Sequence, residues 1–151
     1  MSKTATVRWV EGMEFQAVTG SGHAITMDAR QEVGGRDRGA RPAEMVLVGL
    51  GGCTGMDIVS ILKKMRQDVQ RFEVEASGEE RAEHPKSYER IDVRYRLWGT
   101  ELAPEKVERA IRLSRDRYCV VAHLVSGRAS LRYSFQINDG PWAEVNPAPV
   151  E

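Results

Sequence analysis

Short segments in which apolar residues alternate with polar ones predict most of the strands. Alternation with a period of two is typical of a strand with one buried and one solvated face. Many of the apolar residues in these segments are β-branched or aromatic, and glycine-containing turns separate the first three segments. The predicted strands are residues 4–10, 13–18, 23–28, 71–79, 90–98 and 129–137.

A longer apolar segment between the third and fourth strands predicts a central helix over residues 42–66. Pro42 suits the first helical turn, where its missing N–H would have no partner, and basic residues suit the C-terminal end of the helix dipole. Because apolar residues fall on every side, the pattern is typical of a buried helix. Two shorter helices are expected, one opened by Thr100 or Glu101 with Pro104 and Glu105 as a good first turn, and one over residues 118–124.

The resulting order is βββαββααβ, and we expect a single domain over residues 1–151. Runs of strands with helices between them place the chain in the α+β class, with antiparallel sheets. A helix of roughly 24 residues is about 36 Å long, more than one small sheet can cover. We therefore expect a homodimer in which two such helices pack together. The loop at residues 30–41 should be polar and flexible, and the tail at residues 138–151 irregular.

Four glycines interrupt the central helix within seven positions: Gly49, Gly51, Gly52 and Gly55. Each costs a helix interior roughly 1 kcal/mol relative to alanine, so their presence needs a structural reason. The pattern indicates a smooth face against which another backbone, a second helix or a ligand can lie. Cys53 sits in this patch. It is either a small core residue, as free cysteines often are, or a reactive group beside that surface.

The charge balance narrows the possible partners. The chain has 22 basic and 22 acidic residues, which argues against nucleic acid held by bulk electrostatics.

Charged residues interrupt the apolar segment before it reaches the ~18 residues of a membrane span, and the N-terminus lacks the apolar core of a signal peptide. We therefore expect a cytoplasmic protein outside the membrane. Without a C-x-x-C pair, zinc spacing or Gly-rich phosphate loop, no cofactor or metal is expected.

Two cysteines, Cys53 and Cys119, lie 66 positions apart in apolar helical segments. A permanent disulfide does not fit a reducing compartment, so a transient redox bond is the more natural pairing. Cys119 should lie near the start of the short helix. There the helix dipole lowers a thiol pKa and favours the reactive thiolate.

Two neighbouring titratable residues leave alternatives open. Asp57 follows Cys53 by one helical turn; it can orient a proton or hydrogen-bond a helix end, and its carboxylate would raise the pKa of a nearby thiol. His123 follows Cys119 by four residues and can be a base, a metal ligand or an ordinary surface histidine. A metal site made of Cys53, Cys119 and His123 is a further alternative, although the short ligand pairs of zinc sites are missing.

Three segments are similar to one known family. Residues 42–47 (PAEMVL), residues 51–57 (GGCTGMD) and, far downstream, residues 117–123 (RYCVVAH) resemble the OsmC/Ohr superfamily of osmotically induced and organic-hydroperoxide-resistance proteins. They are most similar to its YhfA-like branch, and the resemblance covers nearly the whole chain. It implies a homodimer with interleaved N-terminal strands and two active sites at the subunit interface.

The resemblance also implies an activity. In the peroxidases of this family the first cysteine attacks the peroxide. Cys53 would therefore become a sulfenic acid, and Cys119 would condense with it to a disulfide. A small dithiol or a lipoylated protein would then restore both thiols. The apolar surroundings would favour organic hydroperoxides over hydrogen peroxide.

Two positions depart from the family pattern. The turn at residues 10–13 lacks the activating arginine that the peroxidases carry there, and Ala43 stands where they have a glutamate. Glu44 is one step further along the helix, which turns a side chain by about 100°, and Arg38 or Arg41 can supply a positive charge from the loop. These departures keep a second function open, a non-enzymatic dimer that binds a small apolar ligand or senses oxidants through its first cysteine.

Overall fold

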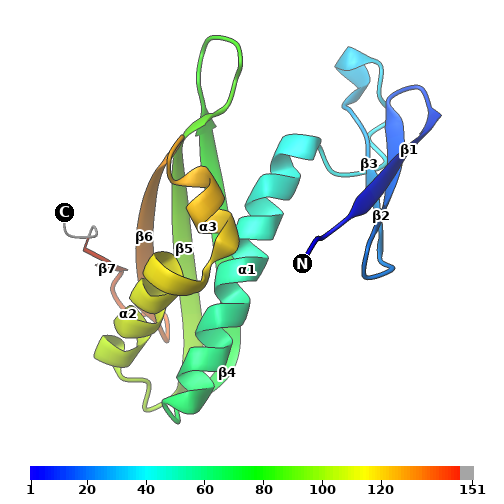
Figure 1. Cartoon of the computed structure of the whole chain (residues 1–151). Coiled ribbons are helices and arrows are strands. Elements are labelled where there is room, and N and C mark those ends of the chain that lie inside the picture. The colour runs from blue at the N-terminus through cyan, green and yellow to red at the C-terminus, as the bar shows by residue number, and fades with distance from the viewer. Residues whose placement is uncertain (147–151) are drawn as a thin grey trace. The chain divides into compact units, whose positions relative to one another are not determined.

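The computed structural model describes residues 1–146, which form two compact units. The first comprises Met1–Val46, and the second begins at Leu47. Figure 1 shows their elements, with helix α1 (Pro42–Lys64) beginning in the first unit and continuing into the second. The predicted order βββαββααβ is confirmed, with one more short strand at the end. Residues 147–151 of the tail predicted to be irregular lie outside the described residues.

The first unit is a three-stranded antiparallel sheet whose strands pair in sequence order. They are β1 (Ala5–Glu11), β2 (Glu14–Thr19) and β3 (Ala24–Met27). Gly12 and Gly22 have positive φ in the two turns, a conformation that glycine adopts readily. Of residues 1–46, only Ala17 and Asp28 are buried. This sheet therefore has almost no core of its own.

The connection from β3 to α1 is folded around the Asp28 carboxylate and contains one 3-10 turn, η1 (Gln31–Val33). The two carboxylate oxygens accept the backbone N–H groups of Ala29, Arg36 and Arg38 at 2.7, 3.1 and 3.2 Å. Burial opposes ionisation of Asp28, but these hydrogen bonds bring its pKa below the usual value. The sequence predicts a flexible loop here. The structure instead shows a segment organised by one buried acidic side chain.

The second unit contains a four-stranded sheet in the order β4-β5-β6-β7. Its strands are β4 (Asp68–Glu80), β5 (Tyr88–Thr100), β6 (Ser130–Ile137) and β7 (Ala143–Glu144). The β4–β5 pair is antiparallel, as predicted, and so is the pair of β6 with the additional strand β7, whereas β5 and β6 run parallel. Parallel neighbours need a long crossover. It consists of α2 (Pro104–Leu113), the π-helical turn η2 (Ser114–Tyr118) and α3 (Val120–Val125).

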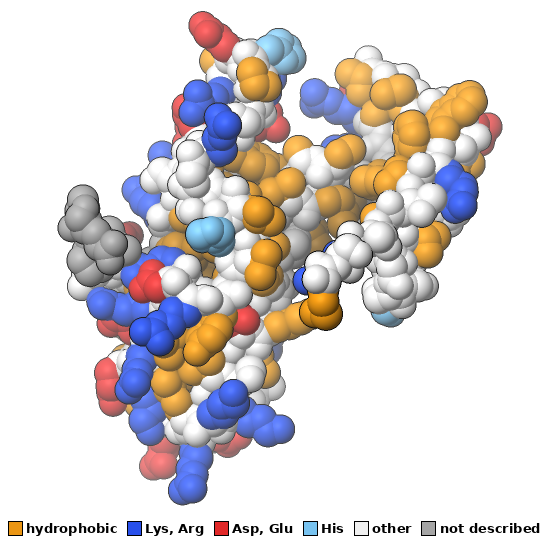
Figure 2. All heavy atoms as spheres, viewed as in Figure 1, with side chains coloured by type: hydrophobic (Ala, Val, Ile, Leu, Met, Phe, Trp, Pro, Cys, Tyr) orange, Lys and Arg blue, Asp and Glu red, His pale blue; other side chains and the backbone are white. Residues whose placement is uncertain are grey.

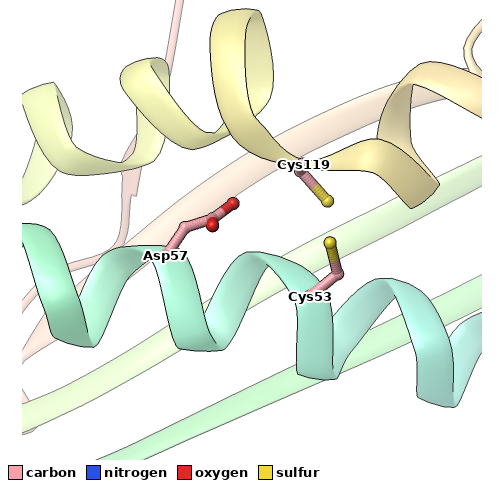
Figure 3. A group of neighbouring side chains, drawn as sticks. All are labelled: Cys53, Asp57 and Cys119. Carbon is pink, nitrogen blue, oxygen red and sulfur yellow. The ribbon is translucent and has the colours of Figure 1, made fainter. Parts of the chain in front are cut away.

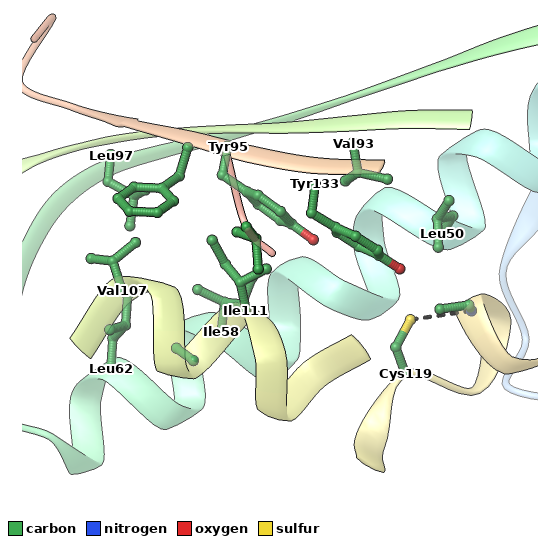
Figure 4. Packing of buried hydrophobic residues seen from close by; sticks show 14 of the residues in the cluster. Leu50, Ile58, Leu62, Val93, Tyr95, Leu97, Val107, Ile111, Cys119 and Tyr133 are labelled. Carbon is green, nitrogen blue, oxygen red and sulfur yellow. Dashed lines mark hydrogen bonds between the residues drawn. The ribbon is translucent and has the colours of Figure 1, made fainter. Parts of the chain in front are cut away.

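The core of the second unit lies between this sheet and the three helices, which cover one of its faces (Figure 1). Strand β5 alternates buried with half-buried residues over much of its length, as its sequence pattern predicts. Figure 4 shows its inward side chains packed toward α1 and α2. The largest fully buried apolar side chains are Leu50, Ile58, Leu62, Ile91, Val93, Tyr95, Leu97, Val107 and Ile111.

Two of the helix glycines face the sheet. A Cβ atom at Gly51 or Gly55 would lie 3.8 or 3.5 Å from a methyl group of Val74 on β4, which is ordinary contact. These two glycines therefore lie against a side chain of the sheet with room for a Cβ, and not against another backbone within this chain. Gly52 has open space instead, since a Cβ there would meet no atom within 4 Å.

Only one face of α1 is buried. On the opposite face Val48 is 61 %, Met56 77 % and Val59 49 % exposed. Within the single chain the predicted burial of this helix is therefore met on one face only, and cover of the other face by a second copy stays a prediction. An 18-residue window of α1 has a mean hydropathy of 1.8, which by length and composition would suit a membrane span. Its buried face nevertheless belongs to the core of the second unit.

Candidate redox site

Cys53 of α1 and Cys119, at the junction of η2 and α3, face each other. In Figure 3 the two sulfur atoms point toward one another, and the carboxylate of Asp57 lies beside them. The two Sγ atoms and a carboxylate oxygen of Asp57 all lie within 4.8 Å of one another. Both cysteines are free thiols. The structure thus brings together the two cysteines singled out from the sequence and adds Asp57 to them.

A local change of helix type places Cys119. Helix α2 runs into the five-residue turn η2, and the N–H of Cys119 donates to the Ser114 carbonyl at 2.8 Å. Cys119 itself is extended, with φ −73° and ψ 100°, so the helix is interrupted and α3 begins at the next residue. Its Sγ accepts the N–H of Ala122 at 3.4 Å, as an N-cap side chain does. Such π-helical turns occur often at functional sites.

Burial governs the acidity of Cys119. Only 3 % of its surface is exposed, and desolvation raises the pKa of its thiol to about 11. The Ala122 N–H opposes this rise, whereas Cys53 and Asp57 add to it. The sequence predicts the opposite direction, a pKa lowered by the dipole of α3. That prediction is wrong because α3 has only six residues and its start is buried, so desolvation outweighs the dipole.

The two thiols differ in accessibility. Cys53 is half-buried on α1, whereas Cys119 is buried. A small reactant from solvent therefore meets Cys53 first. Cys119 is placed to react with a group that Cys53 already carries, so the arrangement supports unequal roles for the two sulfurs.

Three buried hydroxyl groups connect the core to Asp57. Thr54 Oγ1 lies 2.8 Å from the Tyr95 hydroxyl and 2.9 Å from Ser114 Oγ. Ser114 donates to Asp57 Oδ2 at 2.9 Å. Each hydroxyl has one proton, so Thr54 must donate to Ser114, and Tyr95 must donate to Thr54. The result is a directed chain of donors that ends on the Asp57 carboxylate.

This hydroxyl chain was not predicted from the sequence. Thr54, Ser114 and Tyr95 are each no more than 1 % exposed, and burial raises the pKa of Tyr95 far above its ordinary value, which keeps it a donor. One signal was available, since Thr54 lies one turn after Leu50 and one turn before Ile58, on the buried stripe of α1. A buried hydroxyl needs a partner, but the sequence does not say which residue supplies it.

The other predicted site residues lie in the first unit. Glu44 Oε2 accepts the backbone N–H of Arg41 at 2.9 Å, which completes the start of α1 as in a capping box. The Arg41 guanidinium pairs with Asp37 at 2.6 Å, and Arg38 contributes its backbone N–H to the buried carboxylate of the loop. These contacts account for Glu44 and Arg41 as structural residues. A role of Arg38, Arg41 or Glu44 at the thiols stays a prediction.

His123 does not join the thiol cluster. It is exposed on α3 and lines a cavity of about 560 Å³ together with Arg115. Within residues 1–146 the group that can hold a metal is Cys53, Asp57 and Cys119. These residues offer three of the four ligands that Zn²⁺ usually takes.

Comparison with known proteins identifies the family. The family model described as OsmC-like protein matches residues 34–134. The chain belongs to the OsmC-like protein family. The resemblance found in the sequence is thereby confirmed, and this OsmC-like protein shares its fold with solved structures at TM-scores of 0.79 and 0.78.

Relatives of known sequence and structure agree with this assignment. Protein YhfA of Escherichia coli is 38 % identical over 133 residues, which cover 88 % of this OsmC-like chain and 96 % of YhfA. A hypothetical protein of Aquifex aeolicus has a TM-score of 0.81 and 31 % identity, covering 91 % of this chain and 97 % of that one. An organic hydroperoxide resistance protein OsmC of Legionella pneumophila has a TM-score of 0.66 and 14 % identity, covering 90 % and 97 %. The last likeness concerns the fold alone.

Proposed function

We propose that this OsmC-like protein is a thiol-dependent peroxidase that reduces organic hydroperoxides through Cys53 and Cys119. The observation that carries the proposal is a half-buried and a buried thiol within 4.8 Å of each other. One sulfur can meet a small oxidant while the other is held ready to close a disulfide. The contact of Cys53 with the apolar core supports this substrate class, and the Legionella protein that shares the fold is itself named for organic hydroperoxide resistance.

The reaction has three steps. The Cys53 thiolate attacks the distal oxygen of the hydroperoxide, the O–O bond breaks, and the alcohol leaves after taking a proton. Cys53 is then a sulfenic acid, whose sulfur Cys119 attacks to form a disulfide and water. A small dithiol or a lipoylated protein restores both thiols by exchange. A reducing, cytoplasmic setting keeps the two thiols free between turnovers.

The activating charge comes from the loop before α1 in this proposal. Arg38 or Arg41 would stabilise the Cys53 thiolate, and Glu44 would hold the arginine in place. Glu44 accepts the backbone N–H of Arg41, and the Arg41 guanidinium, paired with Asp37, would have to exchange that partner to reach the thiolate. The family's usual arginine and glutamate positions are not filled in the same way here.

We further infer that the protein is a homodimer in which a second copy covers the exposed face of α1. Apolar side chains reach the surface on the face seen in Figure 2. The exposed apolar residues of the second unit include Val48, Met56 and Val59 of α1 and Val120 and Leu124 of α3. Large contiguous apolar surface is rare on monomers, and two-fold assembly is the commonest way to cover it. The first unit, with its nearly coreless sheet, would gain packing in the same way.

Hydroperoxide consumption with a dithiol reductant tests the activity. The wild type should turn over an organic hydroperoxide faster than hydrogen peroxide. Cys53→Ser should abolish turnover, and Cys119→Ser should consume about one equivalent and then stop as a sulfenic acid open to over-oxidation. Mass spectrometry should find an intramolecular disulfide in the oxidised wild type and in neither variant. Two thiols that stay reduced under excess hydroperoxide would overturn the proposal.

The high pKa of the Cys119 thiol favours a second function, oxidant sensing without rapid turnover. A pKa of about 11 leaves little thiolate at neutral pH, which slows both closure and reduction of a disulfide. A sensor would react once with hydroperoxide and then persist as the disulfide in the presence of dithiol. A peroxidase would show steady turnover under the same conditions.

A further inference from the structure

Asp57 has no part in the chemistry described so far, although it lies within 4.8 Å of both sulfurs. A carboxylate beside two thiols disfavours thiolates, and Asp57 adds to the raised pKa of Cys119. Closure of the disulfide nevertheless requires one proton to be removed and one to be supplied. Cys119 enters as a neutral thiol and must lose its proton as it attacks, while the hydroxide that leaves Cys53 must gain one.

We propose that Asp57 carries this proton, taking it from Cys119 and delivering it to the hydroxyl group that leaves Cys53. The inference rests on the proposed function, because closure follows oxidation of Cys53. The Cys119 sulfur bonds to the Cys53 sulfur, and the S–O bond of the sulfenic acid breaks with its electron pair on oxygen. That oxygen takes the proton from Asp57 and departs as water. The carboxylate is regenerated, and the sulfenic acid is the only oxidant consumed.

The position of Asp57 suits this task. It follows Cys53 by one turn of α1, so the two side chains project from the same side of the helix. Its Oδ2 accepts the Ser114 hydroxyl, and within residues 1–146 no protein group donates to Oδ1. One oxygen is therefore held in place, and the other is available to the thiol proton. A general base works within direct hydrogen-bond reach or through one water.

The buried hydroxyl chain fixes this arrangement. Donation from Ser114 holds the Asp57 carboxylate in a fixed orientation. Tyr95 and Thr54 in turn fix the direction in which the Ser114 hydroxyl points, because each has only one proton to give. Polar side chains in an apolar core are costly unless they are paired. A role in holding Asp57 would explain why all three hydroxyl groups are present in the core.

The other titratable groups around the thiols are poorer candidates. Figure 4 shows the hydroxyl of Tyr133 on β6 directed toward Cys119, and it has no hydrogen-bond partner among the described residues. Burial raises the pKa of Tyr133 to about 12, and that of Tyr95 on β5 is raised further. Both phenols therefore keep their protons and are poor bases. Cys53, the remaining neighbour, is the reaction partner itself.

The test is the rate of disulfide closure in Asp57→Asn after one equivalent of an organic hydroperoxide. Sulfenic acid formation at Cys53 should keep its rate within a fewfold, while closure should slow by roughly a hundredfold, the usual size of a general acid–base contribution. Rapid quenching with a thiol reagent and mass spectrometry measure the two steps separately. Loss of the Asp57 charge should also lower the Cys119 pKa. A purely electrostatic role therefore predicts faster closure, the opposite sign.

Matched variants separate proton transfer from structural damage. Asp116→Asn removes a carboxylate that pairs with Arg115 and should close at the wild-type rate. Ser114→Ala keeps the Asp57 carboxylate but removes the hydrogen bond that orients it. Disulfide closure should therefore slow less than in Asp57→Asn, and the pH profile of the closure rate should shift. Tyr133→Phe should have little effect. A Tyr133→Phe rate as low as that of Asp57→Asn would place the proton transfer on Tyr133 and overturn the proposal.

A second route to closure does not need hydroperoxide. An aryl disulfide converts Cys53 to a mixed disulfide, and Cys119 then displaces an aryl thiolate that needs no proton. Asp57→Asn should slow this closure less than the hydroperoxide route, because only the proton removal from Cys119 remains. If hydroperoxide fails to oxidise Cys53 in the wild type, the proposed peroxidase fails, and the aryl route still tests Asp57. Closure in Asp57→Asn at or above the wild-type rate by the aryl route would refute its role.

Discussion

The two faces of helix α1 both carry apolar residues, but one face is buried and the other is exposed. Leu50, Ile58 and Leu62 lie under the sheet and are almost completely buried, whereas Val48 and Met56 face away from it and are exposed. Both faces carry apolar residues, so the hydrophobic pattern does not separate them. The difference teaches that apolar residues on every side of a helix do not decide which of its faces the chain itself buries.

The residues that α1 contributes to the candidate site lie at the margin between these two faces. Cys53 and Asp57 are both half-buried on α1, between the core side and the open side. Their chemistry therefore depends on both. The buried face supplies the hydroxyl chain that reaches Asp57, and the open face is the side from which solvent reaches Cys53.

The largest expected contrast is between Ile58→Ala and Met56→Ala. Ile58 is fully buried, so its truncation should cost about 2–5 kcal/mol of unfolding free energy through lost contacts and a cavity. Met56 is exposed in the single chain, so its truncation should cost less than about 0.5 kcal/mol at low protein concentration. Urea unfolding at several concentrations measures both.

The same pair of variants tests the partner. If a second copy covers Met56, the cost of Met56→Ala should grow with protein concentration, and light scattering should show weaker dimerisation. A cost of Met56→Ala that does not change with concentration, with a wild type that scatters as a 16.9 kDa monomer, would contradict the dimer.

Much of the fold could be predicted because local sequence patterns determine most of its strands and helices. The period of two in β5 and the Pro42 start of α1 both correspond to what the structure shows. The parallel pairing of β5 with β6 could not, because alternation shows which face of a strand is buried and not which neighbour it has or in which direction. The short β7 was also missed, since two residues carry no periodicity.

The site was predictable only in part. The family resemblance singled out Cys53 and Cys119, which the structure places together. The acidity of Cys119 was predicted with the wrong sign, because burial is a tertiary property that the start of a helix does not reveal. The contact of Ser114 with Thr54 and Asp57 joins positions 60 and 57 residues apart, and no local pattern connects them.

A smaller effect concerns pH. The thiol pKa of Cys119 rises from an ordinary 9.0 to about 11 on folding. A group with a raised folded pKa contributes stability that is complete below about pH 9 and is lost as the pH rises through about 11. The loss should be on the order of 1–2 kcal/mol after solvent screening. Urea unfolding at pH 8 and pH 11 should therefore show a steeper decline for the wild type than for Cys119→Ala. Parallel declines would mean that burial does not shift this thiol.

The smallest effect, Gly52→Ala, bears most directly on the open face of α1. Alanine is favoured over glycine in a helix interior by about 1 kcal/mol, and a Cβ at Gly52 meets no atom within 4 Å in the single chain. The substitution should therefore stabilise the monomer at low concentration. If a second helix packs against Gly52 in the dimer, the added methyl group should weaken dimerisation severalfold. Gly51→Ala is the matched control, because its Cβ would face Val74 within the same chain. It should stabilise the protein similarly at every concentration. If both substitutions raise the unfolding free energy equally and neither changes dimerisation, no partner helix lies against Gly52. The two faces of α1 would then differ only in that one of them is exposed to water.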